Sequence, residues 1–224
     1  MNEVMGSSIC PKNTPSEPGR AGRPKSQEKR NQILTAASDL FLEHGFTNTS
    51  MDLVAAQSGV SKQTVYSHFK NKDKLYTAVI DWKCNEYQLD FGHTQDLGPL
   101  PDALKQVATQ VVALMHDEKV IAMYRVVIGE ARANPHVAEL FYDAGPQQSV
   151  HALTHYLAKQ QTVPLTNEQA REAAIDFFNL LKSEFHMRSI LEMPFALNQK
   201  QRDHLINSTV RKTLALIHLA SEQQ

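Results

Sequence analysis

Hydrophobic residues recur at helical spacing along most of this 224-residue chain. In the first such segment, from about residue 26 to residue 44, they are Ile33, Leu34, Ala37, Leu40 and Phe41. The same spacing predicts further helices over residues 101–116, 119–133, 136–160, 167–191 and 199–221. No stretch alternates apolar and polar residues over the length of a strand. The pattern therefore predicts an all-α fold of about nine helices.

Between residues 50 and 69 the helical pattern breaks once and then restarts. The apolar positions of the two short predicted helices are Met51, Val54, Ala55, Val65 and Phe69. Gly59, which lies between them, can adopt the positive φ of a sharp turn. Ser50 or Thr49 can cap the first helix and Ser61 the second. This arrangement predicts a helix-turn-helix whose second helix enters the DNA major groove, with a three-helix unit that binds a protein as the alternative.

The first 26 residues lack periodicity and are rich in Pro, Ser, Gly and Asn, which predicts disorder. Arg20, Arg23 and Lys25 are basic, and Gly22-Arg23-Pro24 resembles the core of arms that insert arginine into the minor groove. A solubilising tail is the alternative. We expect a disordered basic arm over 1–26, a DNA-binding domain over 27–87 and a larger helical domain over 88–224.

The net charge of −1 conceals an asymmetry along the chain. Residues 1–83 carry 11 Lys and Arg against 8 Asp and Glu, whereas the remainder carries 12 against 16. The positive excess therefore coincides with the predicted DNA-binding part. There is no signal-peptide pattern and no run of the ~20 apolar residues that a membrane span needs. Two cysteines 74 positions apart form no disulfide framework, so we expect a cytoplasmic protein without a membrane partner.

A more specific signal runs from Arg30 to Ile80. Its matching residues are Ile33-Leu34, Ala36-Ala37, Leu40-Phe41, Gly45-Phe46, Thr49-Ser50, Val54-Ala55, Ser58-Gly59-Val60-Ser61, Thr64-Val65-Tyr66, His68-Phe69 and Lys72-Asp73-Lys74-Leu75. This pattern resembles the N-terminal DNA-binding domain of TetR-family transcriptional regulators. A second set, Arg125-Val126-Val127, Glu130, Pro135, Phe141 and Gly145-Pro146, is similar to the AefR-like subgroup of ligand domains. The resemblance implies a ligand-responsive regulator, most simply a repressor, that binds a double-stranded, pseudo-palindromic DNA operator as a dimer.

Under that resemblance the start of the second short helix would read the DNA sequence. Gln63 can form two hydrogen bonds with adenine, and Thr64 offers thymine a hydroxyl and a methyl group. Lys62 could contact guanine or a phosphate. Tyr66 and His68 have polar tips suited to phosphate contacts.

Three more residues complete the expected DNA-binding surface. Lys72 would open the next helix and pair with a phosphate beside that helix's positive end. Ser50 and Ser61 begin the two short helices. Asp52 departs from the basic residue that some family members have at this position, and it would repel a phosphate.

The resemblance also implies a homodimer formed through the last two helices. Their apolar stripes suit an interface or a core equally well, and comprise Ile175, Phe178, Leu181, Lys182, Phe185, Met187, Leu205, Ile206, Val210, Leu214, Ile217 and His218. The second domain would bind an unidentified small-molecule effector in a largely apolar cavity. Candidate lining residues, each more often a plain core residue, are Met115, Met123, Tyr124, Phe141, Tyr142, Phe177 and His186.

Cys84, His151 and His155 are the remaining candidates for chemistry. The two histidines share i, i+4 spacing and could bind a metal, but solvated or core histidines are the simpler interpretation. Cys84 lies between the predicted domains, where it is either a redox switch or a small buried hydrophobe. No catalytic motif accompanies them, so we predict no enzyme activity, metal or cofactor. The rival hypothesis is a helical small-molecule-binding protein or enzyme with a vestigial DNA-binding unit.

Overall fold

The computed structural model describes residues 27–87 and 98–222, which form ten helices and no strand. The helices are α1 (Gln27–Asn48), α2 (Met51–Ser58), α3 (Lys62–His68), α4 (Lys72–Glu86), α5 (Leu100–Leu114), α6 (Glu118–Ala131), α7 (Pro135–Ala144), α8 (Pro146–Ala158), α9 (Asn167–Ile190) and α10 (Gln199–Ser221). The predicted all-α class is confirmed. The predicted arm, with Arg20, Arg23 and Lys25, lies outside the described residues.

One predicted helix, over residues 136–160, is divided into α7 and α8. The division falls at Gly145, whose φ of −116° and ψ of −85° are not helical, and Pro146 begins α8. A proline cannot donate the backbone hydrogen bond of a helix interior, and it disfavours helical geometry in the preceding residue. The apolar spacing continues across this break, so periodicity alone does not reveal it.

The first hydrophobic core is formed by helices α1, α2, α3 and α4 together. Phe41, Phe46 and Tyr76 form an aromatic cluster at its centre, with ring centroids 5.0 to 6.0 Å apart. The core also includes Met123 and Val127 of α6, and Val137 and Phe141 of α7. The expected boundary near residue 87 is therefore crossed by hydrophobic packing, which ties α6 and α7 to the first four helices.

The second core lies among α5, α8, α9 and α10. Its fully buried side chains include Leu104, Leu153, Phe177, Leu181 and Ile217. Of the residues predicted to form either an interface or a core, Leu181, Phe185, Ile206 and Ile217 belong to this core within a single chain. Burying apolar area of this kind stabilises the fold by about 25 cal/mol per Å².

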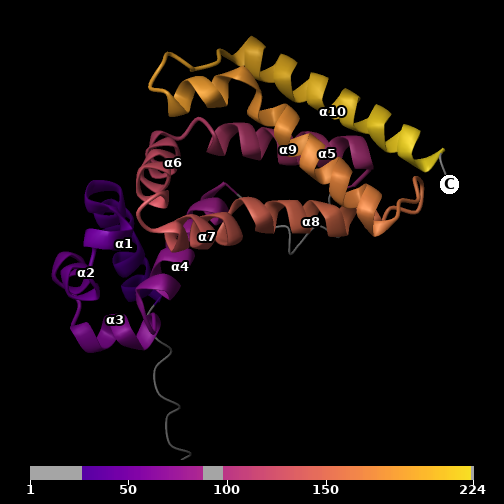
Figure 1. Cartoon of the computed structure of the whole chain (residues 1–224). Coiled ribbons are helices and arrows are strands. Elements are labelled where there is room, and N and C mark those ends of the chain that lie inside the picture. Colours follow the sequence, from indigo (N-terminus) through magenta and orange to yellow (C-terminus); the bar gives the residue numbers. More distant parts are fainter. Residues whose placement is uncertain (1–26, 88–97, 223–224) are drawn as a thin grey trace, which may run out of the picture.

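The two cores lie at different ends of the molecule (Figure 1). Helices α1 to α3 gather at one end, and α10 runs along the opposite side against α9 and α5. Helix α6 lies between them and contacts both α1 and α9. Within the two described ranges, no helix combines the length and the apolar character required to cross a bilayer.

Candidate functional site

The α2–α3 unit is formed by short-range hydrogen bonds and one glycine. Ser50 Oγ accepts a hydrogen bond from the Leu53 N–H at 3.1 Å, and Ser61 Oγ accepts one from the Thr64 N–H at 3.2 Å. Gly59 ends α2 with φ 70° and ψ 14°, the left-handed conformation. The predicted caps and turn are confirmed, and they set the angle at which α3 leaves α2.

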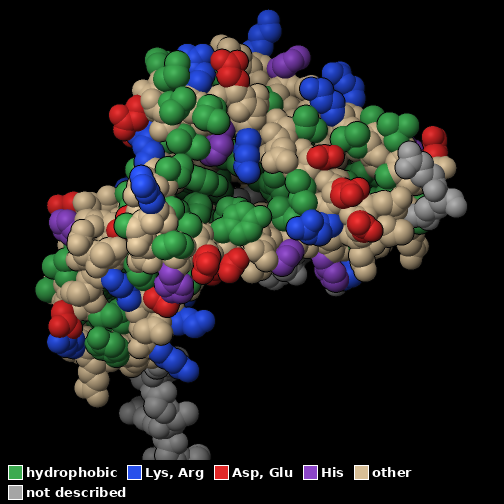
Figure 2. Space-filling model, in the orientation of Figure 1, with side chains coloured by type: hydrophobic (Ala, Val, Ile, Leu, Met, Phe, Trp, Pro, Cys, Tyr) green, Lys and Arg blue, Asp and Glu red, His purple; other side chains and the backbone are tan. Residues whose placement is uncertain are grey.

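Helix α3 is held on one side and exposed on the other. Val65 is fully buried and Phe69, its C-cap, is nearly so. On the opposite side Lys62 and Gln63 are exposed, and Tyr66 keeps 48% of its surface accessible. Several Lys and Arg side chains surround this end of the molecule (Figure 2). The polar face can therefore meet a partner without disturbing the core.

Two predicted contact residues are half-buried at the edges of that face. The Thr64 hydroxyl lies 2.8 Å from Ser61 Oγ, so the side chains at the start of α3 restrain each other. His68 ends the helix with its ring 6.1 Å from that of Phe69. Both residues lie on the same helix as Gln63, so α3 brings the predicted contact residues together.

Asp52, which replaces the basic residue of some family members, forms an ion pair with Lys62, a predicted DNA-binding residue. Its Oδ2 lies 2.5 Å from Lys62 Nζ, and both side chains are largely exposed. An exposed ion pair of this kind contributes little stability because water screens it. Its main effect is on charge, since Asp52 partly neutralises the one lysine of the α3 face.

Lys72 is directed toward the protein rather than away from it. Its Nζ donates to the carbonyl oxygens of Phe46 at 2.7 Å and Thr47 at 3.3 Å, and it lies 4.3 Å from the Phe46 ring centroid. Burial lowers the pKa of Lys72, against the opposing effects of Glu130 and Asp73. Lys72 therefore stabilises the end of α1. From the sequence, only a phosphate contact was expected of this residue.

Glu130 of α6 binds the same segment through its backbone N–H groups. Its carboxylate accepts the N–H of Phe46 at 2.9 Å and the N–H of Thr47 at 3.1 Å. Gly45, just before them, has φ 75° and ψ 175°, and a Cβ there would lie 2.5 Å from Glu130 Oε1. This backbone region is essentially restricted to glycine. Residues 45–47 thus form the joint between the DNA-binding helices and α6, which we call the α1–α6 joint.

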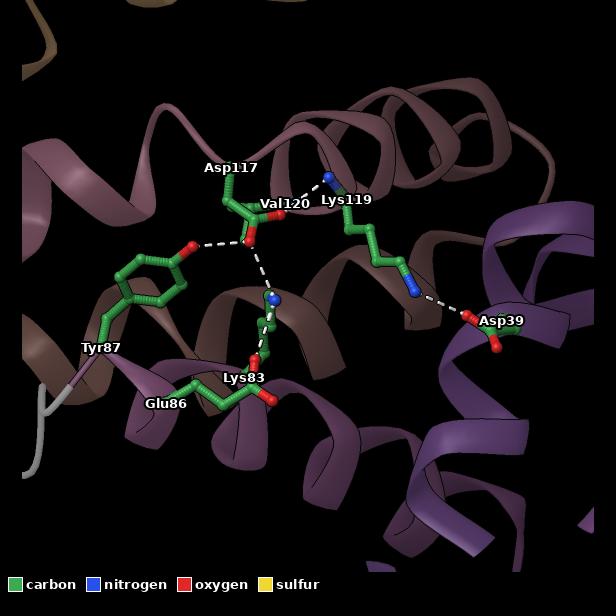
Figure 3. A network of polar contacts seen from close by, with 7 residues as sticks. All are labelled: Asp39, Lys83, Glu86, Tyr87, Asp117, Lys119 and Val120. Carbon is green, nitrogen blue, oxygen red and sulfur yellow. Dashed lines mark hydrogen bonds and ion pairs between the residues drawn. The ribbon is translucent and has the colours of Figure 1, made fainter. Parts of the chain in front are cut away.

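A second polar network connects the other end of α6 to α1 and α4 (Figure 3). Asp117 is the N-cap of α6. Its Oδ2 accepts a hydrogen bond from the Tyr87 hydroxyl at 2.6 Å and lies 2.9 Å from Lys83 Nζ. Burial opposes the ionised form of Asp117, but the hydrogen bonds from Tyr87 and Lys83 outweigh it and lower the pKa. Lys119 pairs with Asp39 of α1 at 2.9 Å. Both ends of α6 are therefore bonded to the DNA-binding half.

A cavity of about 210 Å³ is lined by the first half of α6, including Lys119, Met123 and Tyr124. Of the seven residues predicted to line it, Met115, Met123, Tyr124, Phe141 and Tyr142 do so. Phe177 lies in the second core instead, and His186 is buried against the Tyr124 ring with centroids 5.1 Å apart. Hydrophobic side chains gather around the hollow between α6, α8 and α9 (Figure 2).

Several lining residues were not predicted as cavity residues. The α9 wall consists of Ile175, Phe178, Asn179 and Lys182, three of which the sequence pattern had suggested for an interface or core. Cys84 also lines the cavity, and burial raises the pKa of its thiol to about 11. A thiol held in its neutral form is a poor nucleophile, which favours the interpretation of Cys84 as a small hydrophobe. His151 and His155 are exposed, and the described residues contain no cluster of three or more metal ligands.

Two protein families match this chain. Residues 33–79 match the bacterial regulatory proteins of the tetR family, and residues 102–216 match the C-terminal domain of AefR-like transcriptional repressors. The second match alone covers about half of the chain. The chain belongs to the TetR family.

Individual relatives agree with this assignment. The transcriptional activator FasR of Mycolicibacterium smegmatis is 43% identical over 61 residues, which are 27% of this chain and 28% of FasR. The regulator SrpR of Pseudomonas putida is 34% identical over 74 residues, or 33% and 34% of the two chains. The chain thus matches about a third or less of the length of these two relatives.

Solved structures match over much more of the TetR-family fold. The flavonoid-responsive regulator FrrA is 30% identical, with a TM-score of 0.63 over 85% of this chain and 97% of FrrA. A TetR-family regulator from Mesorhizobium loti has a TM-score of 0.66 at 21% identity, over 87% and 98% of the two chains. The TetR family consists of DNA-binding transcriptional regulators rather than enzymes, in agreement with the prediction from the sequence.

Proposed function

We propose that this TetR-family chain is a cytoplasmic repressor that binds a DNA operator as a homodimer and releases it when a small molecule fills the cavity. The DNA-binding part of this proposal is supported by helix α3, which is buried on one side and exposed on the other. Val65 and Phe69 anchor the helix in the first core, while Lys62, Gln63 and Tyr66 remain exposed. A rigid helix with an exposed polar start is what major-groove recognition requires.

Within this proposal the α3 residues divide into two groups. Gln63 reads a base edge through paired hydrogen bonds, and the Thr64 methyl contacts thymine. Lys62 meets guanine or a phosphate once it leaves Asp52. Tyr66 and His68 contact phosphates, which position the helix without specifying sequence. The basic arm adds minor-groove contacts through Arg20, Arg23 and Lys25.

The homodimer is supported by apolar side chains that remain exposed on the last two helices and the turn between them. They are Met187, Leu191, Met193, Leu216 and Leu219, each at least 40% accessible. Met187, Leu191 and Met193 lie at one end of the α9–α10 pair and Leu216 and Leu219 at the other, so an interface along both helices would cover both groups. A two-fold dimer would present two α3 helices to half-sites about 34–36 Å apart, which corresponds to a pseudo-palindromic operator.

Coupling between cavity and DNA is supported by the position of α6. Met123 and Tyr124 of this helix line the cavity, and Glu130, farther along it, holds the α1–α6 joint. A ligand that displaces α6 would therefore shift or release α1 and, through it, the α2–α3 unit. A coupling free energy of about 1–3 kcal/mol would change operator affinity roughly 5–150-fold. The family match to repressors and the name of FrrA as flavonoid-responsive favour this function, although FasR is an activator.

The test is selection of DNA sequences by the purified protein, followed by affinity measurements at several salt concentrations. We expect a pseudo-palindromic sequence, with an affinity that falls steeply as salt rises because bound phosphates release counterions. DNA affinity without sequence preference, or the absence of salt-dependent affinity, would contradict the proposal. The latter result would favour the rival of a helical binding protein with a vestigial DNA-binding unit.

A further inference from the structure

We propose that the cavity selects an apolar molecule that carries one anionic group, and that Lys182 is the counter-charge for that group. This inference rests on the proposed ligand-responsive function and narrows it to a class of effector: an amphiphilic carboxylic acid. It follows from the charges of the cavity wall.

Among the residues that the structure describes, the cavity wall carries positive charge and no negative charge. Lys83, Lys119 and Lys182 line the cavity, whereas no Asp or Glu among the described residues does. Burying a cation beside apolar groups is unfavourable unless the cation has a partner. The three lysines therefore need to be considered one at a time.

Two of the three are already neutralised from outside the cavity (Figure 3). Lys83 lies 2.8 Å from Glu86 and 2.9 Å from Asp117, and Lys119 lies 2.9 Å from Asp39. These carboxylates face the adjacent surface depression, which Asp39, Glu86 and Asp117 help to line. A ligand anion gains little from a lysine whose charge is matched in this way.

Lys182 differs from both. It is half-buried, and within residues 27–87 and 98–222 neither an ion pair nor a hydrogen bond engages its ammonium group. The nearest acidic residue in sequence, Glu184, pairs with Arg188 instead. Burial lowers the pKa of His186, and the positive charge of Lys182 lowers it further, although the non-helical Ser183 separates these two residues of α9. The positive charge of Lys182 is therefore available to a ligand.

The neighbours of Lys182 suit an acid whose remaining part is apolar. Asn179, almost one turn earlier on α9, adds an amide donor at the same wall, and Ile175 and Phe178 continue that face with apolar surface. Opposite elements contribute Val111, Met115, Met123 and Phe141. A cavity of about 150 Å³ accommodates benzene, so the 210 Å³ here suits a phenyl ring with a short chain or a chain of similar volume.

The test compares acids with alcohols of the same skeleton by titration calorimetry at pH 7.5. The pairs are 4-phenylbutyrate with 4-phenylbutan-1-ol and octanoate with 1-octanol. We expect at least one acid to bind about tenfold more tightly than its alcohol, the equivalent of one charged hydrogen bond. Lys182→Met should abolish the preference without weakening alcohol binding, and Lys182→Arg should retain it. Lys105→Met, an exposed lysine of α5 outside the cavity, is the matched control.

Equal binding of acid and alcohol, an acid preference that survives in Lys182→Met, or no binding of any of the four compounds would overturn the inference. Circular dichroism and thermal unfolding confirm that each variant is folded. DNA binding separates this result from the proposed function. If the wild-type protein binds its selected operator but shows no acid preference, only the ligand class is wrong; if it binds no operator, the regulatory function is wrong.

Discussion

The DNA-reading end and the cavity are constructed in different ways. In the α2–α3 unit, the two capping hydrogen bonds join residues three positions apart, and the side chains predicted to read DNA lie on the exposed side. The cavity is assembled from seven helices, and several side chains that line it also support a core. A substitution at the reading face should therefore change DNA recognition alone. A substitution of an apolar cavity residue that also supports a core should affect stability, ligand binding and DNA binding together.

The largest effect is expected at the α1–α6 joint. Gly45→Ala introduces a Cβ into a backbone region reserved for glycine and against the Glu130 carboxylate. We expect a loss of about 3 kcal/mol in the free energy of unfolding, from strain and weakened hydrogen bonds. Urea denaturation measures it. Gly59→Ala is the control: Gly59 also has a positive φ, but open space surrounds it, so we expect a loss of about 1 kcal/mol. Equal losses would argue against a special function for the joint.

At the reading face we expect a change in specificity without a change in stability. Gln63→Ala should cost about 2 kcal/mol of discrimination at one base pair of each half-site. Its free energy of unfolding should stay within about 0.5 kcal/mol of wild type, because the side chain is exposed. Binding to a panel of single-base operator variants gives the first quantity. A uniform loss across the panel would place Gln63 on a phosphate instead.

These two predictions also show what the sequence could and could not reveal. The caps at Ser50 and Ser61 and the turn at Gly59 were predictable because their partners lie within one helical turn. The partners of Glu130 are 83 and 84 residues away, so no local pattern specifies them. The α9 wall illustrates the same limit. Phe177 was expected in the cavity. Both Phe177 and the adjacent Phe178 pack in the second core, but only Phe178 also lines the cavity, since periodicity identifies a buried face but not its neighbours.

A smaller effect is expected when the Asp52–Lys62 pair is broken. Asp52→Asn releases Lys62 and removes a negative charge from the DNA-binding surface. We expect operator affinity to rise about threefold for all sequences, with a steeper dependence on salt. Fluorescence anisotropy at several salt concentrations measures both quantities. A change in base preference would instead show that Lys62 reads a base. Asp102→Asn, on α5 in the other half of the fold, serves as the control for general charge effects.

The smallest expected effect is on the pH dependence of stability. It involves two histidines whose pKa values shift in opposite directions. The hydrogen bond to Asp73 at 2.9 Å raises the pKa of His136, whereas burial lowers that of His186. A raised pKa means that the His136–Asp73 contact stabilises the fold fully below pH 6.5 and loses its effect as pH rises through the folded-state pKa. The difference in stability between wild type and His136→Gln should therefore be largest in mildly acidic buffer and fade above neutrality. His186 should act in the opposite sense, destabilising the fold as pH falls. A pH-independent difference for His136→Gln would contradict the first part.

In the proposed mechanism, α6 connects cavity occupancy to operator binding through Glu130. The most direct measurement is the operator affinity with and without a saturating acid from the calorimetric pairs, for wild type, Glu130→Gln and the control Glu118→Gln on the exposed start of α6. We predict that the acid weakens operator binding roughly 5–150-fold in wild type and in Glu118→Gln. In Glu130→Gln the factor should fall toward one while acid binding is retained. An unchanged factor in Glu130→Gln, or no weakening in wild type by an acid that binds, would show that Glu130 and α6 do not couple the cavity to the operator.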